Sequence, residues 1–216
     1  MKLRLLPLLA FVLLLISCSS SNTRITKSWV NKDAVKKEKY NTIFIAALNP
    51  NTEDKATLEN ELAYWANQNN IKPVKSHEVF ANVTKDNMPT KEELLNTIRG
   101  TKSEVIFTIA LKDVKTADYA RGSVYIPVGP TISFYGYYSN VFPLVYDVEY
   151  YTPDKTYYVE SNIYDAETEE LLWSAQSETY NPSDFENFIK GYVNSLFKQL
   201  EKDGILKKGA IEPKYK

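Results

Sequence analysis

Few side chains in this sequence of 216 residues could carry catalytic or metal chemistry. The chain has one histidine, His77, and one cysteine, Cys18. A single cysteine excludes an intramolecular disulfide and a thiolate-rich structural zinc site, and a single histidine excludes every triad or metal site that needs two. No Gly-x-Ser-x-Gly elbow, phosphate-binding glycine-rich loop or His-Glu-x-x-His helix occurs. We therefore predict no metal and no cofactor, and a structural or solvent-exposed position for His77.

Acidic residues beside aromatic ones leave one enzymatic hypothesis open. A glycoside hydrolase needs only two carboxyl groups at a suitable separation. Asp113 with Asp118, or Asp147 with Glu149, flank an aromatic segment. The chain has 27 acidic residues, so these four are equally consistent with solvated loop positions. A glycan-binding or glycan-hydrolysing protein is thus the alternative to a non-enzymatic one.

Tyrosine is the unusual component of the composition, with 16 residues, most of them between positions 119 and 158. Tyrosine offers a rigid amphipathic surface and is enriched where proteins meet. Three interpretations stay open: an extended β-hairpin with arms at 121–128 and 143–151, a binding surface for protein or glycan, and an active site. The candidate binding residues are Tyr135, Tyr137, Tyr138, Phe142 and Tyr146.

The first eighteen residues are typical of a bacterial lipoprotein signal. Lys2 and Arg4 precede an apolar run over residues 5–16, which is too short to cross a bilayer core of roughly 30 Å as a helix. The run ends in Leu15-Ile16-Ser17-Cys18, which resembles the lipobox, whose cysteine is acylated and becomes the mature N-terminus. We predict a signal peptide over residues 1–17, fatty acyl chains such as palmitate on Cys18, and a tether over residues 18–39 with at most a weak strand around residues 25–30. The expected location is the outer membrane, facing the periplasm.

Overall composition is that of an ordinary globular protein, with 44% hydrophobic and 25% charged residues. These values exclude a disordered or collagen-like chain. The 26 basic residues include Lys2 and Arg4, so the processed chain has fewer basic than acidic residues. We therefore expect no nucleic-acid partner and no electrostatic attraction to anionic lipid.

Hydrophobic periodicity predicts one α/β domain with a mixed sheet over residues 40–206. Continuous apolar runs at 42–48 and 105–111, separated by helical patterns, indicate parallel strands in a βαβ-like first half. Segments 156–164 and 171–178 alternate like an antiparallel hairpin, with Trp173 on the core face. A capping box at Ser183 opens a final helix whose apolar stripe includes Phe197. A tyrosine-rich insertion spans residues 113–155, and residues 207–216 form a polar tail.

Together these features resemble a group of bacterial envelope lipoproteins that includes the peptidoglycan-synthase activator lipoproteins and the curli-secretion lipoprotein. The most specific element is the hairpin Tyr164-Asp-Ala-Glu-Thr-Glu-Glu-Leu-Leu-Trp173, and the similarity covers roughly residues 40–206. The tyrosine-rich insertion departs from the pattern. The resemblance implies a protein that works by binding or assembly, so we expect a non-enzymatic accessory component with a protein partner, or a glycan. The sequence leaves the oligomeric state open.

Overall fold

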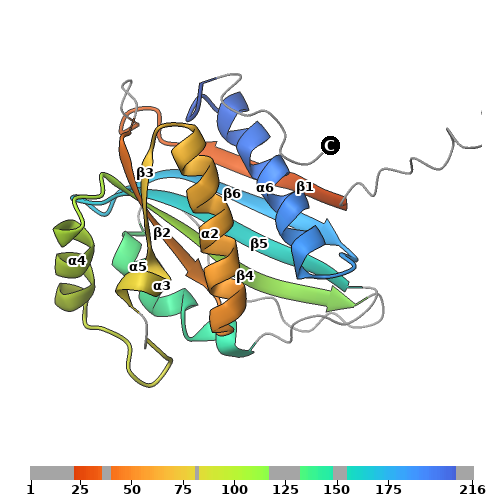
Figure 1. Ribbon diagram of the computed structural model, residues 1–216, viewed down its shortest axis with the longest axis horizontal. Coiled ribbons are helices and arrows are strands. Elements are labelled where there is room, and N and C mark those ends of the chain that lie inside the picture. Colours follow the sequence, from red (N-terminus) through yellow and green to blue (C-terminus); the bar gives the residue numbers. More distant parts are fainter. Residues whose placement is uncertain (1–21, 36–39, 81–82, 117–131, 148–154, 208–216) are drawn as a thin grey trace, which may run out of the picture.

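The computed structural model describes residues 22–35, 40–80, 83–116, 132–147 and 155–207 (Figure 1). Its centre is one mixed sheet of six strands in the order β1-β6-β5-β4-β2-β3. β2 pairs in parallel with β3 and β4, whereas β4, β5, β6 and β1 pair antiparallel in that order. The strands are β1 (Asn22–Val30), β2 (Thr42–Leu48), β3 (Lys72–Lys75), β4 (Val105–Thr116), β5 (Lys155–Asp165) and β6 (Leu171–Tyr180).

Helices cover both faces of this sheet, which confirms the predicted α/β class (Figure 1). The long helices α2 and α6 pack on one face, where they form the first hydrophobic core with the sheet. Helices α4 and α5 pack on the other face and form the second core. The helices are α2 (Thr52–Gln68), α3 (Ser76–Val79), α4 (Lys91–Gly100), α5 (Phe134–Val141) and α6 (Phe185–Lys202), with a 3₁₀ turn at Leu144–Asp147.

Most residues of β2 and most of the first seven residues of β4 are apolar, because both faces of the sheet are covered there. Phe107 and Ile109 of β4 face the first core, and Ile106 and Ala110 face the second. Period-2 alternation places successive side chains on opposite faces, so a strand buried on both sides must be hydrophobic at every position. β2 and β4 are parallel neighbours, as the sequence predicts.

The β5–β6 hairpin follows the prediction, and helix α6 lies where it was expected, although Asp184 rather than Ser183 caps it. Ile163 lies opposite Trp173 in the hairpin, and Trp173 is completely buried in the first core. The turn is closed by the carboxylate of Asp165, which accepts hydrogen bonds from the backbone N–H groups of Glu167 and Thr168. Phe197 of α6 belongs to the same core.

The segment predicted as a tether with at most a weak strand around residues 25–30 contains the full strand β1, which starts earlier, at Asn22. β1 pairs along β6 at one edge of the sheet, with a β-bulge between Ile25 and Lys27. Ser195 of α6 donates a hydrogen bond to the Thr23 carbonyl at 3.0 Å, so the strand is also held from the helix side. The described fold therefore begins at Asn22 rather than near residue 40. The predicted signal peptide and Cys18 lie outside the described residues.

None of the helices in the described ranges has both the length and the apolar character needed to span a bilayer.

Candidate functional site

Residues 132–147 of the tyrosine-rich segment hold helix α5 and the 3₁₀ turn. The predicted hairpin arm at 143–151 therefore begins in a 3₁₀ turn, and the arm at 121–128 lies outside the described residues. Ser133 caps α5 by accepting a hydrogen bond from the N–H of Gly136 at 3.2 Å. Tyr137, Tyr138 and Phe142 are only 1%, 6% and 4% exposed. They pack into the second core, which corrects the prediction that they form a binding surface.

Aromatic contacts explain why α5 is buried. The ring of Tyr164 on β5 lies 5.7 Å from that of Phe134 and 6.0 Å from that of Tyr137, and Tyr138 stacks on Phe142 at 5.1 Å. Positions 134, 137, 138 and 141 follow the spacing i, i+3, i+4, i+7 of a helical stripe. That spacing is the signal that predicts the helix, and the surrounding prolines and Gly136 obscure it.

The two remaining candidate binding residues of this segment are Tyr135 and Tyr146, and only the side chain of Tyr135 is described. Tyr135 is half-buried, and its ring lies 5.9 Å from the ammonium group of Lys91. Glu169 accepts a hydrogen bond from the Tyr135 backbone N–H at 3.0 Å and pairs with Lys91 at 2.8 Å. Tyr135 thus helps to fasten α5 to α4 and to the β5–β6 turn. Tyr146 lies in the 3₁₀ turn, and its side chain is outside the described part of the structure.

A buried carboxylate, Glu59 of α2, organises the surroundings of His77. Its Oε1 accepts hydrogen bonds from the Ala47 backbone N–H at 2.9 Å and from the Ser76 hydroxyl at 2.6 Å. Its Oε2 accepts from the His77 backbone N–H at 2.9 Å and lies 2.6 Å from His77 Nδ1. Glu59 therefore ties β2 and α3 to α2, and His77 has a structural contact, one of its two predicted roles.

A second buried carboxylate, Glu160 of β5, lies on the opposite face of the sheet. It is 1% exposed, accepts a hydrogen bond from Asn162 Nδ2 at 3.2 Å and lies 3.5 Å from Lys112 Nζ. Burial lowers the pKa of Lys112, and the charge of Glu160 offsets part of that shift. Burial, with the nearby charge of Glu160, raises the pKa of Tyr137 and of Tyr164 well above the usual value. Both phenols therefore stay protonated at neutral pH.

The acidic pairs of the glycosidase hypothesis are not among the side chains that the structure describes. This holds for Asp113, Asp118, Asp147 and Glu149 alike. Within the described residues, no cluster of three or more His, Cys, Asp or Glu side chains could hold a metal ion.

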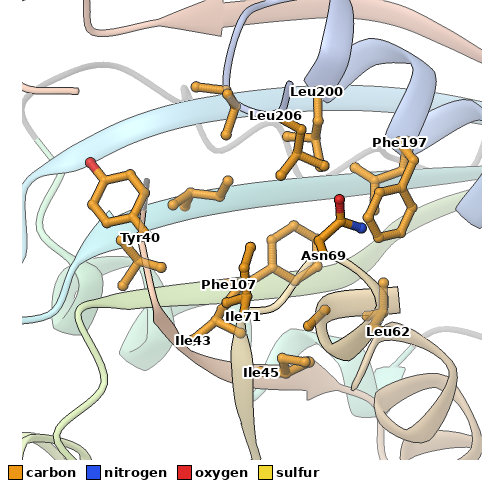
Figure 2. A pocket seen from close by; sticks show the side chains of 15 residues that line it. Tyr40, Ile43, Ile45, Leu62, Asn69, Ile71, Phe107, Phe197, Leu200 and Leu206 are labelled. Carbon is orange, nitrogen blue, oxygen red and sulfur yellow. The ribbon is translucent and has the colours of Figure 1, made fainter. Parts of the chain in front are cut away.

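An apolar pocket opens between α2, α6 and the sheet (Figure 2). Helix α6 ends at Lys202, and the chain reverses at Gly204, whose φ of 77° lies in the left-handed region that favours glycine. The reversed chain is held by hydrogen bonds from the N–H groups of Ile205 and Leu206 to the Leu200 carbonyl. This places both side chains at the pocket. The lining residues are Tyr40, Ile43, Ile45, Leu62, Ala66, Asn69, Ile71, Val105, Phe107, Ile163, Leu196, Phe197, Leu200, Ile205 and Leu206.

The amide of Asn69 does not make this pocket polar, because it serves the helix end. Asn69 caps α2, and its Nδ2 donates to the Trp65 carbonyl at 2.9 Å. The Trp65 ring in turn lies 5.5 Å from that of Phe197 and joins the two helices beside the pocket. Fixed helices thus frame a preformed hydrophobic recess.

The size of the pocket limits what it can hold. Its volume is about 80 Å³. An apolar cavity of about 150 Å³ accepts one benzene molecule, and pockets for drug-sized ligands measure about 300–1,000 Å³. The recess suits a single aliphatic side chain rather than a cofactor. It is the site that sequence reasoning missed, because its walls are distant in the chain.

Comparison with known proteins yields matches to solved structures only: no protein-family model and no curated sequence matches the chain. The PelC dodecamer from Paraburkholderia phytofirmans is 10% identical over 80% of this chain and 94% of that one, with a TM-score of 0.38. Lipoprotein GNA1162 from Neisseria meningitidis is 10% identical over 74% and 99%, with a TM-score of 0.38. A PDZ domain protein from Parabacteroides distasonis is 10% identical over 89% and 39%, with a TM-score of 0.41.

Proposed function

We propose that this chain is a lipid-anchored accessory protein of the bacterial cell envelope that binds another protein and catalyses no reaction. Cys18 is the proposed attachment point, and the outer membrane, facing the periplasm, is the proposed location. The pocket between α2 and α6 is the proposed binding site, and it would receive one aliphatic side chain of the partner. The pocket carries this proposal, because its volume of about 80 Å³ suits an interface anchor.

The proposed attachment rests on the sequence around Cys18. The apolar run over residues 5–16 ends in Leu15-Ile16-Ser17-Cys18, and Cys18 is the only cysteine of the chain. Two or three acyl chains on one cysteine would hold the protein at the membrane, since each buried CH₂ contributes about 0.8 kcal/mol.

The state of the buried acids supports a non-catalytic role. Both oxygens of Glu59 accept hydrogen bonds from groups that position α2, β2 and α3. Glu160 is enclosed beneath α5 and paired with Lys112. Both carboxylates thus stabilise the packing of helices and strands, which supports a structural role for them.

Fractionation of cells that carry Cys18→Ser tests the attachment. We expect this variant to leave the membrane fraction or to remain unprocessed, whereas wild type is found there with an acylated mature N-terminus. Retention of a cleaved and acylated variant in the membrane would contradict the proposal.

A charge at the pocket mouth tests the binding site. Leu206 is part-buried at the pocket, so Leu206→Asp should abolish capture of the partner from native envelopes while the melting temperature changes little. Tyr64→Ser, at an exposed position of α2 outside the lining set, is the matched control and should capture as wild type does. Undiminished capture by Leu206→Asp would remove the pocket from the proposal.

A further inference from the structure

We infer that the end of the sheet that carries Tyr180 rests on the lipid surface, with the Tyr180 side chain among the headgroups. The pocket lies at the opposite end and faces away from the membrane. This inference rests on the proposed acylation of Cys18 and adds an orientation to it.

The distance from the anchor to the fold is short. Three residues, Ser19 to Ser21, separate Cys18 from Asn22, where β1 begins. A fully extended chain advances at most about 3.6 Å per residue, so the Cα atoms of Cys18 and Asn22 lie within about 14 Å of each other. Acyl chains on Cys18 are buried in the bilayer, and this spacing therefore keeps the first residues of β1 close to the headgroups.

Tyr180 lies at this end of the sheet. Its Cα is the partner of Asn22 across the β1–β6 pairing and of Thr156 across the β5–β6 pairing. The Tyr180 side chain is 53% exposed, the largest exposed fraction among the large hydrophobic side chains that the structure describes. Tyrosine is enriched at membrane–water interfaces, because its ring suits the apolar side and its hydroxyl the wet side. Both the position of Tyr180 in the fold and its chemistry therefore fit a place among the lipid headgroups.

Among the described side chains near Tyr180, acidic and basic charges are balanced. Arg24 of β1 forms an ion pair with Glu178 of β6 at 2.8 Å. At the start of α6, Glu186 pairs with Lys190 at 2.6 Å, and Asp184 caps the helix through the Asn187 N–H. A contact of this composition does not depend on anionic lipid. The surface thus fits a zwitterionic bilayer.

The opposite end of the sheet holds both the pocket and a control position. β1 ends at Val30, opposite Trp173, and a strand of this length spans about 27 Å. Tyr64, with 40% exposure the other exposed large hydrophobic side chain described, lies in the last turns of α2. The turn after α2 leads into β3 beside the first residues of β2, which is the pocket end. Tyr64 is therefore far from the proposed membrane contact.

Single-cysteine labelling tests the orientation on the full acylated protein. The chain has no cysteine besides Cys18, so Tyr180→Cys and Tyr64→Cys each supply one free thiol for a bimane fluorophore. Ser183→Cys, at an exposed position near Tyr180, supplies a label that leaves the tyrosine in place. The proteins are reconstituted into phosphatidylcholine vesicles that contain a headgroup-nitroxide lipid. We expect at least threefold stronger quenching at positions 180 and 183 than at 64, unchanged by added phosphatidylglycerol.

The spacer provides a second variable. Insertion of ten Gly and Ser residues between Ser21 and Asn22 should lower quenching at positions 180 and 183 to the level at 64, because the fold can then leave the surface. Equal quenching at all three positions, or none at 180 and 183 in a protein that floats with the vesicles, would overturn the orientation alone. Failure of the protein to float with the vesicles would instead overturn the acyl anchor, and with it this inference.

Discussion

Replacement of Glu59 by alanine tests the buried polar contact that joins α2 to β2 and α3. The change removes the acceptor for the Ala47 N–H and the Ser76 hydroxyl, and both residues are buried. A buried donor left without an acceptor costs about 1–3 kcal/mol. Because two buried donors lose their acceptor, we expect the free energy of unfolding to fall by about 4 kcal/mol. This is a large share of the 5–15 kcal/mol typical of a domain. The backbone N–H of His77 also loses its acceptor, but it adds less because that residue is partly exposed.

Urea denaturation followed by tryptophan fluorescence measures this loss. We expect a lower midpoint with an unchanged m-value, because the unfolded surface is the same. Glu59→Gln keeps the volume and one acceptor oxygen but turns an NH₂ group toward a donor, so its loss should be intermediate. Gln68→Ala, an exposed position of the same helix, is the control and should stay within about 0.5 kcal/mol of wild type. If Glu59→Ala unfolds at the midpoint of Gln68→Ala, the four hydrogen bonds do not hold α2 to β2 and α3.

Three further predictions concern the two cores and one helix cap. Trp173→Ala and Phe197→Ala should each reduce stability by about 3–5 kcal/mol, as a buried aromatic truncation does, and an unchanged melting temperature in both would contradict the assigned core. Tyr137→Ala should cost a similar amount, whereas Tyr135→Ser should cost about 1 kcal/mol or less, because only Tyr137 is fully enclosed; calorimetry of the pair checks this difference. Thr90→Val breaks the capping box of α4 and should cost about 1 kcal/mol at neutral pH. Hydrogen bonds from the backbone N–H and hydroxyl of Thr90 hold the pKa of Glu93 below its usual range. Their stabilisation is thus present above the unfolded pKa of about 4.3 and is lost as the pH falls through the lower folded-state value. The difference between wild type and Thr90→Val should shrink over that acidic range in denaturation measured from pH 7 to pH 3.

Strands and helices with a single strong pattern were predictable from the sequence. β2 and β4 are continuous apolar runs, and α6 carries one apolar stripe behind a cap, so local pattern and tertiary role agree. β1 was expected only as a weak strand, because it is an edge strand in which lysine, arginine and threonine resemble a solvated linker. Helix α5 is short, and the glycine within it and the prolines around it have a local preference for turns. The helix was therefore not predicted.

The site could be predicted far less well than the fold. Glu59 lies in a helix rich in charged residues, and nothing in its spacing distinguishes it from exposed neighbours such as Glu53. Only the meeting of β2, α2 and α3 supplies the donors that make its burial favourable. The pocket likewise combines side chains from elements spread from Tyr40 to Leu206. Its walls are ordinary core residues in the sequence, and their exposure at a recess depends on how α6 ends.

The bulge in β1 bears on whether neighbouring copies of an anchored protein would pair through their sheet edges. Copies anchored close to their first strand would diffuse in a plane with their outer sheet edges at the same height, an arrangement that favours edge-to-edge joining. A β-bulge between Ile25 and Lys27 interrupts the row of backbone groups on that edge. The exposed side chains of Arg24 and Lys27 add charge beside it. Interrupted and charged edges resist pairing with another strand. In a protein anchored as proposed, the nine residues of β1 would therefore also hinder sideways polymerisation of neighbouring copies.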